Sequence, residues 1–210
     1  MKSQKGWREA WRNARERFSA AMGEAESVLL QPSNGTKADW QNLLRALLKD
    51  AHRTGVAIQV LLREGLTDRR IATDSVELLV RHIVERAVLS SFVRKHAHAD
   101  VVARYYKTCA LEFKKVWGRS LDKKSENLPV KRLPSTCQMA EDVGGDLRQA
   151  YRDFSYTIHP RVVPPYSGSE HLSGLSPQQY FCGRLTSVLP VTGDLLTILT
   201  RNFSESQDEQ

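Results

Sequence analysis

The sequence predicts an all-α fold, a single-domain bundle of about six helices. Two observations predict it. Every strongly periodic segment places its apolar residues three or four positions apart, as on one face of an α-helix. No segment of convincing length alternates apolar and polar residues as a strand does. The 210 residues, 40% hydrophobic and 26% charged, are enough to bury one core and are typical of a globular protein.

The first half of the chain predicts four helices. Apolar stripes at helical spacing cover residues 7–29, 40–62, 74–92 and 100–117. A turn at 31–35, rich in turn-forming residues, separates the first two. Gly65 and Gly118 end the second and fourth, since glycine commonly follows the last helical residue.

The second half predicts two helices between polar connections. Residues 119–135 lack a period and contain two prolines, so we expect a loop, followed by a helix from about Cys137 to His159. A proline- and glycine-rich loop covers 160–177, and a last helix covers 177–203, interrupted at Pro190. We therefore divide the chain into an N-terminal helix and turn (1–36), a helical domain (37–203) and a disordered polar tail (204–210).

The formal net charge of +7 favours an anionic partner, with nucleic acid first among the candidates. The alternative is a soluble protein that is merely basic, because the charge is spread along the chain without a dense basic run. No apolar run approaches the roughly 20 residues of a membrane span, so we expect no membrane association. The three cysteines are far apart and lack metal-ligand spacing, which predicts reduced thiols in a cytoplasmic protein without a bound metal.

One short segment carries the chemistry. Arg152 and His159 are seven residues apart, so in a helix they leave the same face, about 10 Å apart along the axis. Arg148 and Ser155 share that face. A guanidinium can hold phosphate oxygens with two hydrogen bonds, and an imidazole can transfer protons near neutral pH. The segment therefore predicts either a phosphodiester-binding surface or a solvated helix back.

Pro160 supports a structural alternative for His159. The residue before a proline is disfavoured in helical geometry, so His159 is expected to end the helix. There it would bond the last free carbonyls and complement the helix dipole. The sequence leaves this role and a catalytic role open.

Helical arginine–histidine spacing of this kind, with polar Asp153 directly after Arg152, resembles the HEPN superfamily of helical proteins. The run Tyr-Arg-Asp-Phe-Ser-x3-His-Pro is also similar to an uncharacterised bacterial family in which an earlier helix carries an Arg-x3-Glu pair, matched here by Arg81 and Glu85. The resemblance spans about residues 40 to 205 but depends on these few positions. From spacing alone, Arg81 and Glu85 are equally consistent with an ordinary ion pair at the edge of the core.

The resemblance implies a metal-independent endoribonuclease without a cofactor, of the kind found among toxins and antiphage effectors. His159 would act as general acid or base, and Arg152, with Arg148, would stabilise charge on the phosphate. Asp153 would orient one of these groups, Ser155 would add a hydrogen bond and Tyr156 would stack on a base. It also implies a homodimer and an antitoxin or other protein partner. The alternative is a non-catalytic module of the same fold that binds nucleotide, RNA or a protein.

Overall fold

The computed structural model describes residues 4–31, 38–64, 69–97, 99–155 and 177–207. Its helices, in chain order, are α1 (Gln4–Leu30), α2 (Asp39–Glu64), α3 (Arg69–Lys95), α4 (Ala99–Trp117), α5 (Lys123–Glu126), α6 (Thr136–Val143), α7 (Gly145–Ser155) and α9 (Pro177–Glu205). No strand occurs in these ranges, so the all-α prediction is confirmed.

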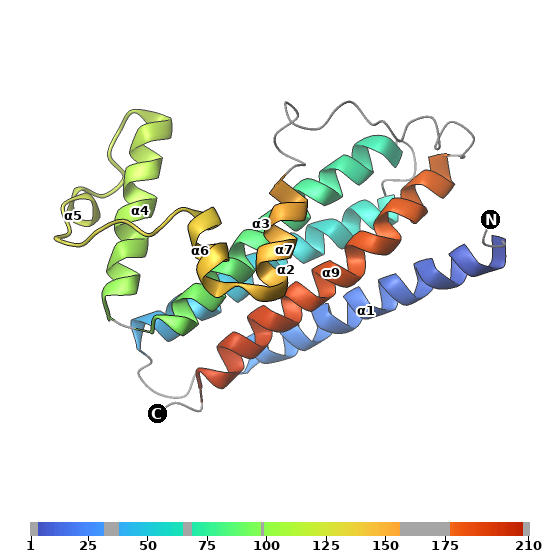
Figure 1. Cartoon of the computed structure of the whole chain (residues 1–210), viewed down its shortest axis with the longest axis horizontal. Coiled ribbons are helices and arrows are strands. Elements are labelled where there is room, and N and C mark those ends of the chain that lie inside the picture. The colour runs from blue at the N-terminus through green and yellow to red at the C-terminus, as the bar shows by residue number, and fades with distance from the viewer. Residues whose placement is uncertain (1–3, 32–37, 65–68, 98, 156–176, 208–210) are drawn as a thin grey trace.

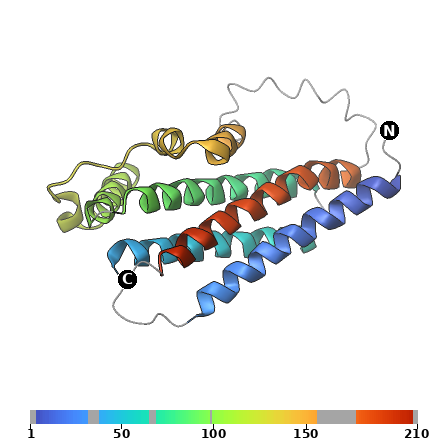
Figure 2. The ribbon, with the colours of Figure 1, turned by 60° about the horizontal axis from the view of Figure 1, so that its bottom comes forward.

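Four long helices, α1, α2, α3 and α9, form an elongated bundle (Figures 1 and 2). α3 is the central element, because it packs against α2, α9, α6 and α7. α1 lies along α9, and α4 and α5 project at one end of the bundle (Figure 1). Of the long helices, α3 is the one on which α6 and α7 mainly pack, at one side of the bundle (Figure 2).

The core explains why these segments are helical. Most of the α3 stripe predicted from the sequence is fully buried, with no exposed surface at Val76, Val80, Ile83, Val84, Ala87 and Val88, while Phe92 is nearly so and Leu79 is partly buried. α1 contributes Ala14, Phe18, Ala21, Met22 and Ala25 to the same core. Burying an aliphatic side chain contributes about 1.5–3 kcal/mol, so packing of these stripes outweighs local helix propensity. The N-terminal helix is thus an integral part of the bundle.

The expected single helix from Cys137 to His159 is wrong in its first half. It is split into α6 and α7 at Gly144, which has φ 74° and ψ −161°. Gly145 follows with φ 53°. Glycine lacks a Cβ and adopts these positive-φ conformations without the clash that other residues meet, so the pair turns the chain sharply between the two helices.

The last helix also differs from expectation. Pro190 was expected to break or kink the last helix; α9 continues through it, so the expected break is wrong. A proline inside a helix costs about 3 kcal/mol, but buried leucines on both sides, Leu185, Leu189, Leu195, Leu196 and Leu199, hold both halves in the core. α9 also extends to Glu205, and the buried Ser206 accepts a hydrogen bond from Gln41 at its carbonyl oxygen. The polar tail therefore begins later than the expected residue 204.

Candidate functional site

Arg81 fastens α7 to the bundle. Its side chain lies on α3 and is only 6% exposed. Its Nη1 donates to the carbonyl oxygen of Tyr151 at 3.0 Å and to Oγ of Ser155 at 2.8 Å. The guanidinium also lies 4.0 Å from the centre of the Tyr151 ring, in a cation–π contact. Two of the predicted site residues, Arg81 and Ser155, therefore meet, and together they fix the position of the motif helix.

Glu85 completes this contact set. Its Oε1 accepts from Nε of Arg81 at 2.9 Å, one helical turn along α3. The carboxylate is more than one third exposed, so it orients the arginine without being sealed in the core. One turn in the other direction, the buried Glu77 pairs with Arg184 of α9. This acidic and basic row of α3 thus connects α3 to both α7 and α9.

Arg148 and Arg152, which we call the arginine pair, lie one turn apart on the exposed side of α7. Both guanidinium groups contact a single carboxylate, Glu141 of α6. Nη2 of Arg152 lies 2.8 Å from Oε1, and Nε of Arg148 binds Oε2. In an unbroken helix Glu141 and Arg152 would lie roughly 16 Å apart along the axis, so the break at Gly144 makes this contact possible.

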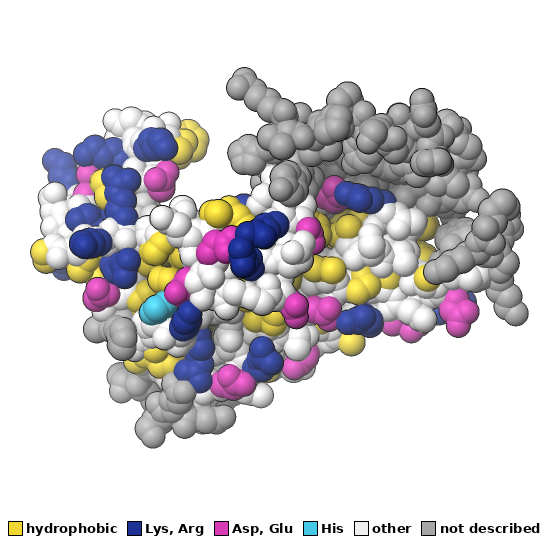
Figure 3. All heavy atoms as spheres, in the orientation of Figure 1, with side chains coloured by type: hydrophobic (Ala, Val, Ile, Leu, Met, Phe, Trp, Pro, Cys, Tyr) yellow, Lys and Arg dark blue, Asp and Glu magenta, His cyan; other side chains and the backbone are white. Residues whose placement is uncertain are grey.

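The arginine pair changes the electrostatics of Glu141. Partial desolvation would raise the pKa of this carboxyl, but hydrogen bonds from Arg152 and Arg148 outweigh it and lower the pKa below its usual value. All three side chains remain between 41% and 49% exposed. Basic and acidic side chains accordingly lie together on the surface over α6 and α7 (Figure 3). The result is two converging guanidinium groups, held by one carboxylate, at the solvent boundary.

The other predicted residues fall into two groups. Asp153 is exposed and accepts from the side chain of Gln149 at 2.7 Å, so it orients neither arginine here. Ser155 faces α3, away from solvent, and donates to the carbonyl oxygen of Tyr151. Tyr156 and His159 lie outside the described residues, and their predicted roles stay predictions.

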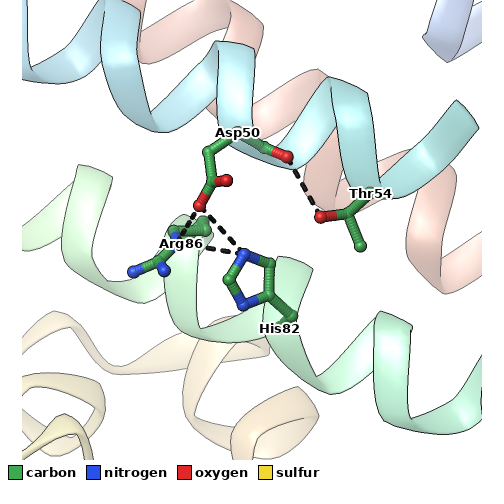
Figure 4. Close-up of polar contacts among 4 residues, drawn as sticks. All are labelled: Asp50, Thr54, His82 and Arg86. Atoms are coloured by element: carbon green, nitrogen blue, oxygen red, sulfur yellow. Dashed lines mark hydrogen bonds and ion pairs between the residues drawn. The ribbon is translucent and has the colours of Figure 1, made fainter. Parts of the chain in front are cut away.

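A second polar cluster was not predicted from the sequence. His82 and Arg86, one turn apart on α3, both reach Asp50 on α2 (Figure 4). Nε2 of His82 lies 2.9 Å and Nε of Arg86 lies 2.6 Å from the same oxygen, Oδ2. The two residues stand one position after Arg81 and Glu85, so α3 carries two neighbouring polar stripes that face different helices. The only sign of this cluster in the sequence was a histidine placed four residues before an arginine.

Nε2 of His82 lies between two polar partners. Asp50 can only accept a hydrogen bond, and Nε of Arg86, 3.3 Å away, can only donate one, so the protonation of Nε2 decides which of the two it binds. The second ring nitrogen is directed away from the carboxylate (Figure 4). Burial would raise the pKa of Asp50, but the hydrogen bonds and charges of His82 and Arg86 lower it overall. An oriented imidazole beside a guanidinium can transfer protons or bind an anion.

Tyr105 of α4 borders this cluster. Burial, followed by the neighbouring Cys109, raises the pKa of Tyr105 to about 12. Its hydroxyl therefore stays neutral at physiological pH and can donate a hydrogen bond but cannot act as a base.

No known family model, curated protein or solved structure matches this chain. Among the described helices, none is long and apolar enough to cross a membrane. The described residues also contain no group of three or more histidine, cysteine or acidic side chains placed to hold a metal ion. Assignment of function therefore depends on the geometry of the two polar clusters.

Proposed function

We propose that this protein binds RNA on the exposed face of α7 and cleaves it as a metal-independent endoribonuclease. One observation carries the proposal: the guanidinium groups of Arg148 and Arg152 converge on one carboxylate at the surface. Two converging guanidinium groups suit the oxygens of a phosphodiester, and a carboxylate between them occupies the place that a phosphate oxygen pair would take. The basic net charge of +7 supports an anionic substrate.

The proposed chemistry assigns each residue one step. The arginine pair exchanges Glu141 for a phosphate and stabilises the negative charge that builds on the non-bridging oxygens. The ribose 2′-oxygen attacks the phosphorus as its hydroxyl loses a proton, the bond from phosphorus to the 5′-oxygen breaks, and the leaving oxygen takes up a proton. His159 serves one of these two proton transfers as general base or general acid, and solvent water serves the other. The products are a 2′,3′-cyclic phosphate and a 5′-hydroxyl. DNA lacks the nucleophile and is not cut.

The proposal includes a two-fold homodimer. A single face of α7 is open to water and cannot enclose a scissile phosphate alone. A two-fold interface would bring two copies of the arginine pair to one axis, where they repel each other unless an anion lies between them. Light scattering at micromolar concentration, with and without an RNA oligonucleotide, tests this. A strict monomer in both conditions would contradict the dimer and weaken the nuclease proposal.

A second candidate function is a non-catalytic module that binds RNA, nucleotide or a protein partner such as an antitoxin. The observation that favours it is that the side chains assigned to the site on α7 already have partners within the protein. Glu141 occupies the arginine pair, Gln149 binds Asp153, and Arg81 binds Ser155. A ligand would then compete with Glu141 for the arginines without any chemistry following.

One experiment separates the two candidates. Purified protein is incubated with labelled RNA in EDTA, and the products are tested for cyclic phosphate. Cyclic-phosphate ends that require Arg152 and His159, tested as Arg152→Ala and His159→Ala, support the nuclease. Comparison of the cleavage rates of His82→Ala and His159→Ala identifies which of the two imidazoles the reaction requires. Binding of RNA without any cleavage would select the non-catalytic module.

The chain offers a matched control in Arg45 and His52, a second arginine–histidine pair at the same spacing. Nη2 of Arg45 donates to the carbonyl oxygens of Leu29 and Gln31 at 3.0 and 3.2 Å, so it caps the end of α1. His52→Ala should leave cleavage unchanged. Equal loss of activity in His52→Ala and His159→Ala would show that the assay reports folding rather than the site.

A further inference from the structure

We infer that a groove between α3, α4 and α6 binds the phosphate groups of a single RNA strand that extends from the arginine pair. The groove has a volume of about 430 Å³, and its wall includes Phe92, His96, Arg104, Lys131, Arg132 and Asp142. The inference rests on the proposed function for its substrate class. It adds a binding surface that the chemistry on α7 does not require.

The charge of the groove favours an anion. Arg104, Lys131 and Arg132 bring three cations to it, against the single carboxylate of Asp142. That carboxylate is already neutralised, because Oδ2 lies 2.9 Å from Nε2 of His96 and 3.2 Å from Nζ of Lys95. Basic side chains also gather on the surface over the neighbouring α4 and α5 (Figure 3). The field in the groove is therefore positive.

Two of the three cations are available to a ligand. Lys131 and Arg132 are exposed, and neither side chain has an ion pair or hydrogen bond in the described part of the chain. Nε of Arg104 is buried and has no hydrogen-bond partner among the described residues. A phosphate in the groove can therefore pair with Lys131 and Arg132 without breaking an existing contact of either side chain.

The wall that carries these cations is fixed by α4. Three side chains of α4 bind the backbone of the connection 127–135, between α5 and α6. Lys107 donates to the Leu128 carbonyl oxygen at 2.6 Å, and Arg104 donates to the Arg132 carbonyl oxygen at 3.2 Å. The hydroxyl of Thr108 accepts from the Leu133 amide at 2.9 Å. At the end of this connection, Ser135 and Gln138 form a capping box that starts α6. The groove is therefore built into the fold before a ligand arrives.

The position of α6 connects the groove to the arginine pair. Asp142 faces the groove, while the preceding residue, Glu141, holds the arginine pair on the other side of the same helix. Successive residues on a helix point about 100° apart, so the two surfaces adjoin around α6, and a strand of a few nucleotides can reach from one to the other. A single nucleic-acid strand carries one phosphate per nucleotide and can lie along this row of cations.

The test measures binding of fluorescently labelled RNA by anisotropy, with oligonucleotides of about four and about sixteen nucleotides. The variant Lys131→Gln/Arg132→Gln should lower the affinity for the long RNA about tenfold. It should leave the affinity for the short RNA within about twofold of that of the unmodified protein. The variant should also make the slope of log affinity against log salt concentration for the long RNA shallower by about 1.4, because two phosphate contacts, each worth roughly 0.7 in this slope, are lost. The matched control is Lys123→Gln/Lys124→Gln in the exposed α5, which removes the same charge outside the groove.

The outcomes separate this inference from the proposed function. If Arg148→Gln/Arg152→Gln leaves the long RNA bound and the groove variant releases it, the groove stands and the α7 proposal fails. Equal weakening by the groove and α5 variants would overturn the groove, because net charge alone then explains binding. A labelled mononucleotide that binds as tightly as the long RNA would overturn the strand model in favour of a small phosphorylated ligand. Absence of binding by every RNA would overturn both proposals.

Discussion

Replacement of Arg81 by methionine tests whether the structure holds α7 as described. The two hydrogen bonds from the buried guanidinium to α7 contribute about 1.5 kcal/mol each, which is the low end of the range for a charged donor. The low end applies because Ser155 also donates to the Tyr151 carbonyl oxygen, so that oxygen keeps a hydrogen bond when Arg81 is replaced. The cation–π contact adds about 1 kcal/mol. The ion pair with the partly exposed Glu85 adds only a few tenths.

Methionine keeps the length of the side chain and removes a buried charge, which offsets part of this loss. We therefore expect Arg81→Met to lower the free energy of unfolding by about 3 kcal/mol, which corresponds to about 6–12 °C in Tm for a chain of this size. Thermal and urea unfolding followed by circular dichroism measure it. Because α7 carries the arginine pair, RNA binding by the folded variant should fall as well.

Two controls make the result specific. Arg201→Met removes an exposed pair with Glu205, also four residues apart, and should change stability by less than about 0.5 kcal/mol. Ser155→Ala combined with Arg81→Met should cost about 1 kcal/mol less than the two single changes together, because both remove the same hydrogen bond. A Tm for Arg81→Met within about 2 °C of the unmodified protein would refute the anchoring of α7 by Arg81.

Three further predictions address the break, the acidic partner and the second cluster. Gly144→Ala should lower stability by about 1–3 kcal/mol in urea unfolding, because its positive φ suits glycine alone. Glu141→Gln should tighten RNA binding several-fold in anisotropy, since it removes the competing charge. Asp50→Asn should cost about 1 kcal/mol at neutral pH. Because folding lowers the pKa of Asp50, its contribution is present above the unfolded pKa of about 4 and is lost as the pH falls through the folded pKa, so the stabilities of the variant and the unmodified protein should converge in acid below that folded pKa.

The sequence predicted the helices well because their apolar stripes repeat at one period and all enter one core. The stripe of α3 is the clearest case, since six of the eight residues chosen for their spacing have no exposed surface. The break in the motif helix was missed although Gly144 and Gly145 stand next to each other in the sequence. Adjacent glycines lower helix propensity by about 1 kcal/mol each, which packing often overrides, so propensity alone could not place the break.

The site was predicted in part. Arg81, Glu85 and Ser155 were chosen from a short motif, and the structure brings them together. Glu141 was missed because its contact with the arginine pair exists only across the break at Gly144. The Asp50 cluster joins residues 32 and 36 positions apart, and a contact between two helices leaves no local spacing that a single sequence can reveal.

The position of α6 gives the two proposed surfaces a physical link. Successive residues on a helix point about 100° apart, so Glu141 and Asp142 serve different neighbours. Glu141 holds the arginine pair of α7, and Asp142 holds His96 and Lys95 at the end of α3. A phosphate that displaces Glu141 removes one tie between α6 and α7 while Asp142 keeps α6 on α3. Binding at the arginine pair therefore changes α7 more than the groove, and the groove can hold a strand while the arginine pair exchanges its partner.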